Sequence, residues 1–577
     1  MPGSEEFVQR AVHALEVGEL AVWVKRALLA IAIVALATFY LYHFRGLATS
    51  QAMDQAQIGR AIASGHGWRT NFIRPRAVGQ LIAHGKNVPQ KVWRDTYNAP
   101  LPPLVDAIAL FPLRGHLKMG ENQLVYPGDK AIALMSILIF IAAVAALFFT
   151  VRRLFDQRIA LLTCGLILLC DMMWQYALSG LPQMLLLLLF NLTAYAIVRA
   201  VEERYSGGPV GIWLAAVGIG FGFLALTHAL TLWLFFPFVA FAVFFFRPRW
   251  SALLIPLIAC AIIYLPWLLR NFLVCGNPAG VAIYSILDGL GHSEAGWMRR
   301  IAVGFEGTGP AALTNKLLTN SLTQSGRIFE FFGFSVVAMM FFVALMHRFK
   351  RSETAVVQWM LLIMWIGAFI GMSIFGINEE QGVAANQLHL IFMPLLTSYG
   401  LAYLFVLWRR LDIDLRLARI AFVTFLYLLC TTPLIFSTLF LQPKSLVRWP
   451  PYLPPVIGVL NDWMKPQEIT ASDMPWAIAW YADRPSIWVP ETIKTMSDLS
   501  DYNTLGAPIN GLYLTPISST ENTYRDIVKG EYKDWAPVIQ RTIQLENFPL
   551  KWATIGLGLD AECAFFSDHD REHEKRP

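Results

Sequence analysis

The chain has 577 residues, of which 56% are hydrophobic and only 15% are charged, and its mean hydropathy is +0.49. Soluble globular proteins carry about a quarter charged residues, so this composition excludes an ordinary soluble enzyme and predicts a membrane protein with several spans. The formal net charge of +6 does not indicate a nucleic-acid partner, because Lys and Arg cluster beside apolar segments, where they orient a chain in the membrane.

Residues 1–26 are predicted to form a cytoplasmic interfacial helix. Phe7, Ala11 and Leu15 share one helical face, and Lys25-Arg26 precede the first apolar span. No small-residue cleavage site follows this span, so we expect a signal anchor rather than a cleaved signal peptide.

Residues 27–440 are predicted to form the transmembrane domain. Its apolar segments each approach the roughly 20 residues that cross a bilayer core. Eleven such segments lie near 27–44, 131–151, 159–175, 181–199, 210–228, 230–246, 252–270, 329–346, 355–375, 385–408 and 419–440.

The positive charges predict the orientation of these eleven spans. Clusters of Lys and Arg precede the first span and follow the second, fourth, sixth, eighth and tenth. If all eleven segments cross, every cluster lies on one side, which is then the cytoplasm. The N-terminus is therefore expected inside and the C-terminus outside the plasma membrane, the inner membrane in a Gram-negative bacterium. Loops 45–130 and 271–328 and the tail 441–577 are expected on the outer side.

The tail 441–577 is predicted to be a small α/β domain. The segments "EITAS" and "GLYLTP" have the composition of strands, and "MPWAIAWYA" has that of a helix opened by Asp473.

The loop 45–130 is too long to be a simple connector. Its first part, "TSQAMDQAQIGRAIASGHGW" at 49–68, has helical spacing and carries Asp54. Two interpretations of Asp54 stay open: a helix-start carboxylate placed by the helix dipole, or a catalytic base at the membrane surface. Farther along, the apolar stretch 104–113 is too short to span and predicts a second interfacial or re-entrant helix.

Polar residues collect at the predicted outer ends of the spans rather than at mid-membrane. Arg270 and His389 are candidate partners for an anionic lipid headgroup. The alternatives are snorkelling for Arg270 and a neutral hydrogen bond between helices for His389. Because charged residues are almost absent from the spans, a transporter of charged solutes is disfavoured.

Four segments carry a resemblance to a known group. They are "AMDQAQIGRAIASGHGW", "YNAPLPPLVDAI", "LPWLLRNFLVCGNP" and "SDMPWAIAWYADRPSIWVP". In order and topology they resemble the GT-C class of membrane glycosyltransferases, and within it bacterial protein O-mannosyltransferases and aminoarabinose transferases. The expected fold is thus a polytopic α-helical membrane protein of GT-C-like architecture with a C-terminal extracytoplasmic α/β domain.

This resemblance implies an inverting transfer of a sugar from a polyprenyl-phosphate donor to an acceptor hydroxyl outside the cytoplasm. The acid of the first loop is the catalytic base in this class, so the resemblance implies that role for Asp54. The acceptor, whether a protein, a glycan or a lipid, and the transferred hexose or pentose stay open.

The sequence departs from the class where the lipid phosphate is bound. Gln55 follows Asp54 where many relatives have a second acid, Leu101 precedes Pro-Pro-Leu where some have Lys, and Leu388-His389 replaces a distal Arg-Tyr. The candidates for binding the phosphate are then Arg270 and His389, Arg74 or Arg76, or a divalent cation. A divalent cation is the one possible cofactor.

Trp476 and Trp480 lie four residues apart on the predicted helix of the outer domain. Aromatic faces stack on sugars, so both are candidates for acceptor binding. The alternative is that they form the domain core or dock it to the membrane part.

Two other functions stay open. A flippase of lipid-linked saccharides would also have many spans and a polar outer rim, although the chain shows no internal repeat and no GxxxxGK[ST] nucleotide site. A non-enzymatic assembly subunit would require no individual outer carboxylate.

Overall fold

The computed structural model describes residues 19–47, 49–119, 123–302, 304, 307–412, 415–439, 453–515, 531–539, 548–555 and 563–571. The chain forms two compact units, Met1–Phe44 and Arg45–Pro577. The described part of the first unit is the helix α2 (Glu19–His43), which contains most of the first predicted span. Most of the interfacial helix predicted for residues 1–26 lies outside the described residues.

The second unit contains the long apolar helices of a helical membrane protein. Among the described residues, seven helices are long and apolar enough to cross a bilayer. They are α6 (Pro127–Leu154), α9 (Gln183–Ser206), α10 (Val210–Thr227), α12 (Arg249–Cys275), α17 (Ser352–Phe375), α18 (His389–Arg410) and α19 (Arg416–Leu439). The pair α7 (Gln157–Leu168) and α8 (Asp171–Leu178) is bent by 59° and makes an eighth span if it crosses as one unit.

The remaining predicted spans are shorter in the structure. The segment near 230–246 is η2 (Ala229–Thr231) followed by α11 (Leu232–Phe245). The segment near 329–346 is divided into α15 (Ile328–Phe331) and α16 (Val336–Ala344) by Gly333 and Phe334, which have φ angles of 62° and 57°. This left-handed backbone breaks an α-helix, so helix length alone does not establish eleven spans or the predicted orientation.

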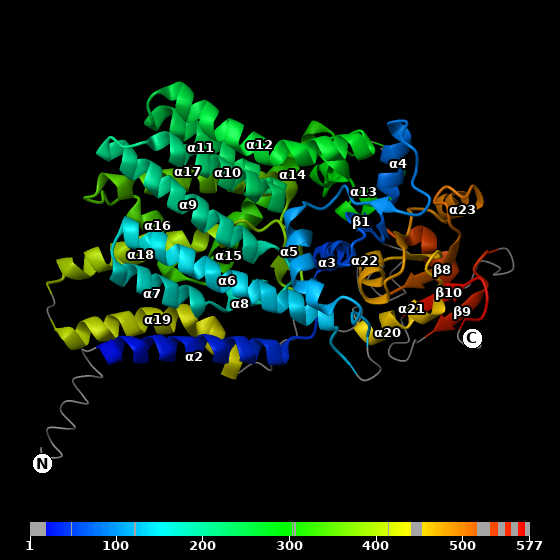
Figure 1. Cartoon of the computed structure of the whole chain (residues 1–577), viewed down its shortest axis with the longest axis horizontal. Helices are drawn as coiled ribbons and strands as arrows, with labels where there is room; N and C mark the ends of the chain where they lie inside the picture. The colour runs from blue at the N-terminus through cyan, green and yellow to red at the C-terminus, as the bar shows by residue number, and fades with distance from the viewer. Residues whose placement is uncertain are drawn as a thin grey trace, which may run out of the picture. The chain divides into compact units, whose positions relative to one another are not determined.

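Small residues let neighbouring helices approach closely. In α10, a Cβ atom on Gly218 would lie 2.4 Å from the carbonyl oxygen of Pro256 in α12. Gly367 of α17 faces the backbone of Trp233 in α11 in the same way, at 2.2 Å. Close backbone contact of this kind is the usual way in which membrane helices associate, and Figure 1 shows α9, α10, α11, α12 and α17 in one bundle.

A six-stranded sheet forms the core of the C-terminal part. Its strand order is β2-β7-β6-β8-β10-β9. The strands are β2 (Phe72–Ile73), β6 (Ile469–Ser472), β7 (Ser486–Trp488), β8 (Ile509–Leu514), β9 (Trp552–Ile555) and β10 (Ala564–Ser567). The pairs among β2, β7, β6 and β8 are parallel, and β10 is antiparallel to both β8 and β9. Both predicted strands, "EITAS" and "GLYLTP", are present as β6 and β8.

The helix predicted next to these strands begins differently. It consists of α22 (Pro475–Ala477) and a π-helical turn, η4 (Ile478–Ala482). Asp473 does not cap it: the carboxylate accepts hydrogen bonds of 2.9 Å from both the N–H and the hydroxyl of Thr515, after β8. The other short elements of this part are α20 (Pro454–Gly458), α21 (Leu460–Trp463), α23 (Ile493–Asp501), η7 (Lys533–Trp535) and α24 (Ala536–Ile539).

The edge strand β2 comes from the first long loop. It pairs with β7, more than 390 residues later in the chain, through Phe72↔Ser486 and Ile73↔Ile487. The α/β domain is therefore not confined to the predicted segment 441–577. Loop 45–130 and the C-terminal segment form one folded unit around this sheet.

The same loop contains three helices and a small ribbon. The helices are α3 (Ser50–Ala63), α4 (Pro75–Ala83) and α5 (Leu101–Leu110), which η1 (Phe111–Leu113) extends, and β1 (Arg69–Thr70) pairs with β3 (Trp93–Arg94). Helix α3 packs against α5 on one side and α22 on another (Figure 1). Loop 271–328 contributes η3 (Gly280–Leu287), α13 (Glu294–Met298) and α14 (Pro310–Gly326), and a ribbon of β4 (Glu379–Glu380) and β5 (Val383–Ala384) precedes α18.

Candidate active site around Asp54

Asp54 lies in the second turn of α3 and is 1% exposed. The N-cap of this helix is Thr49, whose hydroxyl accepts the N–H of Ala52, and the N–H and hydroxyl of Ser50 both donate to the Glu380 carboxylate at 2.6 Å. The start of α3 thus has hydrogen-bond partners that do not include Asp54. A buried carboxylate needs its own partners, since burial without them is costly.

Three side chains donate hydrogen bonds to the Asp54 carboxylate. Oδ2 accepts from Nη2 of Arg74 at 2.7 Å and from Nδ2 of Asn98 at 2.6 Å, and Oδ1 accepts from Nε2 of Gln57 at 3.1 Å. Gln57 is itself fixed, because it also donates to Thr70 at 2.8 Å. This network of hydrogen bonds holds the carboxylate in one orientation.

Arg74 is buried between two aromatic rings. Its guanidinium carbon lies 4.0 Å from the ring centroid of Phe72 and 3.8 Å from that of Tyr97. Burial acts against its charge, but the nearby Asp54, Tyr97 and Asp95 hold the pKa of Arg74 above its ordinary value. The stacked rings and the short bond to Asp54 leave this guanidinium little freedom.

Asp95 is a second buried carboxyl on the other side of Arg74. Its Oδ1 lies 3.8 Å from Nη1 of Arg74, and its Oδ2 accepts the N–H of Asn98 at 2.8 Å. Burial and the negative charge of Asp54 raise the pKa of Asp95 from 3.8 to about 6, against the opposing effect of Arg74. Asp54 and Asp95 therefore share one guanidinium.

Arg270 reaches the same cluster from α12. Nη1 of Arg270 donates to the backbone carbonyl of Asp95 and, at 2.9 Å, to the side chain of Asn271. The guanidinium stacks on Trp267 at 4.7 Å, and its other amino group, Nη2, is buried without a hydrogen-bond partner among the described residues. A buried, unsatisfied donor of this kind is what an anionic ligand would satisfy.

A small cavity, of about 20 Å³, lies beside these groups. Arg74, Asp95 and the rings of Phe72, Trp93 and Tyr97 contribute to its wall. Aromatic and charged walls of this kind suit a sugar or a phosphate better than an apolar chain.

The structure does not bring His389 to this cluster. The ring is fully buried, Nδ1 accepts the indole N–H of Trp365 at 3.1 Å, and Nε2 lies 3.3 Å from Oε1 of Gln324. Both nitrogens are thus used between helices. Arg76, the other arginine considered, donates to the carbonyls of Trp297, Ile301 and Ala302 and holds loop 271–328 in place.

Trp476 and Trp480 are buried at the contact between α3 and the α/β domain. Trp476 packs edge-on against Trp488 with a centroid distance of 5.3 Å. Nε1 of Trp480 donates to Asp129 at the start of α6 at 2.7 Å, and Arg60 of α3 lies 5.1 Å from its ring. In this structure both indoles occupy the core and docking positions that were the alternative to acceptor binding.

Arg60 makes several hydrogen bonds across this docking contact. It donates to the carbonyls of Ala479 and Trp480 at 2.6 Å each and to Asp483 at 2.7 Å. Arg60→Met is therefore expected to lower the free energy of unfolding by about 3 kcal/mol, because it leaves buried carbonyls without donors. Thermal unfolding of the purified protein measures this loss. Lys91→Met, at an exposed position, is the control, and an equal melting temperature for Arg60→Met would contradict the docking role.

Sequence reasoning identified Asp54, Arg74 and Arg270 but missed Asp95, Asn98 and Gln57 as their partners. Asn98 lies in the "YNAPLPPLVDAI" segment, and Asp95 lies just before it. The sequence does not show that this segment packs close to α3. Among the described residues no group of three or more His, Cys, Asp or Glu side chains could hold a metal ion. The two carboxyls of the cluster are shared with Arg74, and this donor set does not fit a divalent cation.

Comparison with known families gives a match over part of the chain. Residues 121–269 match the family model of dolichyl-phosphate-mannose-protein mannosyltransferases. This region ends one residue before Arg270 and does not include Asp54, Arg74 or Asp95. A comparison with curated protein sequences finds no match.

Solved structures match most of the chain. The oligosaccharyltransferase of Archaeoglobus fulgidus, in complex with Zn and sulfate, is 13% identical with a TM-score of 0.53, over 86% of this chain and 70% of that one. The archaeal oligosaccharyltransferase AglB from the same organism, with an inhibitory peptide and a dolichol-phosphate, is 12% identical with a TM-score of 0.53, over 89% and 72%. ArnT from Cupriavidus metallidurans, bound to undecaprenyl phosphate, is 13% identical with a TM-score of 0.51, over 94% and 98%.

At identities this low, the structural matches establish the fold alone. The chain has the fold of the GT-C class of membrane glycosyltransferases, which confirms the resemblance seen in the sequence. The matching family consists of glycosyltransferases, and these structural neighbours are glycosyltransferases too. Both agree with the expected enzyme class.

Proposed function

We propose that the chain is an inverting glycosyltransferase that moves a sugar from a polyprenyl-phosphate donor to an acceptor hydroxyl, with Asp54 as general base. The observation that carries the proposal is the buried Asp54 carboxylate, held by Arg74 and Asn98 next to a cavity lined by Arg74 and Asp95. A carboxylate that is buried and fixed in orientation has the features of a positioned base.

In the proposed reaction the acceptor oxygen attacks the anomeric carbon as its proton passes to Asp54. The bond between that carbon and the phosphate oxygen breaks, and polyprenyl phosphate leaves with the electron pair. A positioned base contributes on the order of 10²–10⁴ in rate. The negative charge on the leaving phosphate must be stabilised by fixed donors in the site.

We assign this stabilisation to Arg270 and Arg74. Nη2 of Arg270 is a buried donor without a partner, and Arg74 lies between Asp54 and the cavity. Both are arginines, whose planar guanidinium suits phosphate oxygens. His389 is left out of this assignment because its ring nitrogens are engaged by Trp365 and Gln324.

The donor lipid and the location follow from the same proposal. ArnT was solved with undecaprenyl phosphate and AglB with a dolichol-phosphate and a peptide, which supports a polyprenyl-phosphate donor here. The Lys and Arg clusters support an orientation that places Asp54 outside the cytoplasm of a bacterial plasma membrane. Sugar transfer from defined lipid donors by the reconstituted protein tests the whole proposal.

Asp95 gives the proposed site a pH signature. Its pKa is about 6 in the folded protein and 3.8 ordinarily, so the folded state keeps a proton that the unfolded chain loses. The stability that this proton provides is present below pH 3.8 and is lost as the pH rises to about 6. We expect the melting temperature of the wild type to fall across this window relative to Asp95→Asn. The amide does not titrate, and the other acids cancel in the comparison. Parallel curves for the two proteins would show that Asp95 titrates normally.

A further inference from the structure

The two rings that enclose Arg74 are held in different ways. Phe72 belongs to β2, and its ring packs against Trp476 and Trp488 of the α/β domain with centroid distances of 6.0 and 5.7 Å. Tyr97 lies in the irregular segment that follows β3. Among the described residues, the one contact found for the face of this ring is that with Arg74. This side of the enclosure therefore depends on what holds the Tyr97 hydroxyl.

Glu294 holds that hydroxyl. The Tyr97 O–H donates a hydrogen bond to Oε1 of Glu294, which also accepts from the hydroxyl of Ser285 at 2.9 Å. Burial raises the pKa of Tyr97 well above its ordinary value, so the phenol keeps its proton and stays a donor. Because the ring is held at its backbone end and at its hydroxyl end, it cannot turn away from the guanidinium of Arg74, whose carbon lies 3.8 Å from the ring centroid.

Glu294 is itself fixed by the α/β domain. It is the first residue of α13, and its N–H donates to Asp288 at 2.6 Å. Ser293, the N-cap of α13, donates through its N–H and its hydroxyl to the Glu531 carboxylate, at 2.8 and 2.6 Å. Just after α13, the buried Arg299 donates to three backbone carbonyls of the α/β domain. Both ends of α13 are thus attached to that domain, which sets the position of Glu294.

We infer that Glu294 is a positioning residue of the transfer reaction, which acts through Tyr97 on Arg74 and so on the orientation of Asp54. The inference rests on the proposed function, because it concerns the base assigned there. The connection consists of the Tyr97 hydrogen bond, the stacking of that ring on Arg74, and the 2.7 Å hydrogen bond from Arg74 to Asp54. A base held in one orientation reacts faster than one that samples several.

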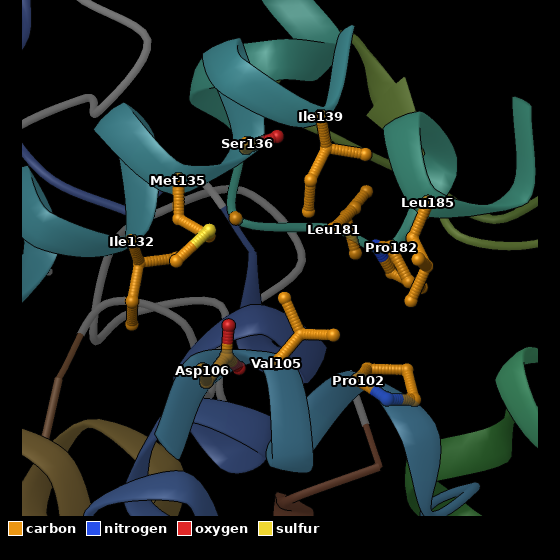
Figure 2. A pocket seen from close by; sticks show the side chains of 11 residues that line it. Pro102, Val105, Asp106, Ile132, Met135, Ser136, Ile139, Leu181, Pro182 and Leu185 are labelled. Carbon is orange, nitrogen blue, oxygen red and sulfur yellow. The ribbon is translucent and has the colours of Figure 1, made fainter. Parts of the chain in front are cut away.

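Asp106 is a buried acid without such a connection. It lies in α5 and points into a small hollow of about 30 Å³ between α5, α6 and the turn before α9 (Figure 2). The wall of this hollow is mainly apolar, and none of its lining residues lines the cavity beside Arg74. Asp106→Asn is therefore a control for the loss of a buried acid, and it should leave kcat unchanged.

Rates of polyprenyl phosphate release by the full chain in vesicles test the inference, with the labelled polyprenyl-phosphate sugar that the wild type accepts. Glu294→Ala should lower kcat about three- to tenfold, the effect of one lost hydrogen bond, and should leave KM for the donor within about twofold. Glu294→Gln should keep the wild-type rate, because the amide oxygen accepts from the same two hydroxyls. Glu491→Ala is the matched control: it removes a carboxylate that also joins this segment to the α/β domain, through Arg300 at 2.6 Å, and should leave kcat unchanged.

A double-mutant cycle separates positioning from folding. Tyr97→Phe keeps the ring on Arg74 without its hydroxyl, so it should lower kcat as much as Glu294→Ala and measures the same contact where Glu294→Ala destabilises the fold. The double variant should lose no more than either single variant, because each removes the same hydrogen bond. Losses that multiply in the double variant, an unchanged kcat in both single variants, or an equal loss in Asp106→Asn would overturn the inference. A wild type that transfers no sugar would contradict the proposed function itself.

Discussion

Asp54→Asn is expected to lower sugar transfer by about 10²–10⁴-fold, the contribution of a positioned general base, while the protein stays folded. The amide is nearly isosteric with the carboxylate, and its oxygen can still accept a hydrogen bond. It cannot accept the proton of the acceptor hydroxyl. Arg74 keeps a negative partner in Asp95, at 3.8 Å, so the loss of stability should be limited. Initial rates of transfer from the lipid donor, together with melting temperatures, measure both effects.

The matched control for this substitution is Asp498→Asn, at an exposed position in α23 of the α/β domain. It makes the same chemical change far from the cluster and should leave the rate and the melting temperature unchanged. Near-normal turnover in Asp54→Asn would mean that another group takes the proton, and the assignment of the base would then be wrong.

Arg74→Met is expected to reduce both stability and activity. It leaves Asp54 and Asp95 buried next to each other without their shared cation, and removing one partner of a buried pair costs about 3–5 kcal/mol. Arg74 lowers the pKa of Asp95 and holds Asp54 through a 2.7 Å hydrogen bond, so its removal raises the pKa of Asp95 further and leaves Asp54 without its fixed orientation. We expect transfer at pH 7 to fall at least about 10²-fold and to recover in part at higher pH. A pH–rate profile detects this shift.

Arg74→Lys should fall between the wild type and Arg74→Met, because Lys supplies the charge without the planar contact to Asp54 and the two rings. Arg69→Met, in the neighbouring strand β1, is the control, since no ion pair of Arg69 is found among the described residues. If Arg74→Met lowered the rate with no change in its pH dependence, Arg74 would act on the substrate alone and not on the ionisation of Asp95.

Local patterns predicted much of the fold. Apolar segments predicted the long membrane helices, and short β-rich segments predicted β6 and β8. The helical spacing after position 49 and the apolar stretch 104–113 predicted α3 and α5, although α5 already begins at Leu101. These features depend on residues close together in the chain, which is why a single sequence contains them.

Long-range contacts could not be predicted in this way. The pairing of β2 with β7 joins segments more than 390 residues apart, and two residues make too short a strand to show a pattern. The break in the eighth predicted span depends on the left-handed backbone at Gly333 and Phe334. Nothing in an apolar run indicates that a non-glycine residue such as Phe334 adopts this conformation.

The candidate site shows the same division. Asp54 and Arg270 were identified from the segments around them, but their link through Arg74 and Asp95 exists only once α3, the β1–β3 ribbon and α12 are packed together. The two tryptophans of the α/β domain could equally have lined a sugar site or a core. Their burial against α3 and α6 is a property of the packed structure.

The most direct test of the proposed function is transfer from a panel of labelled polyprenyl-phosphate sugars by the purified chain in vesicles. We predict that one donor yields free polyprenyl phosphate in equal amount to the transferred sugar in the wild type, and that Asp54→Asn abolishes both products. If the labelled lipid crossed the bilayer intact and neither protein released polyprenyl phosphate, the chain would be a flippase and the glycosyltransferase assignment would be contradicted.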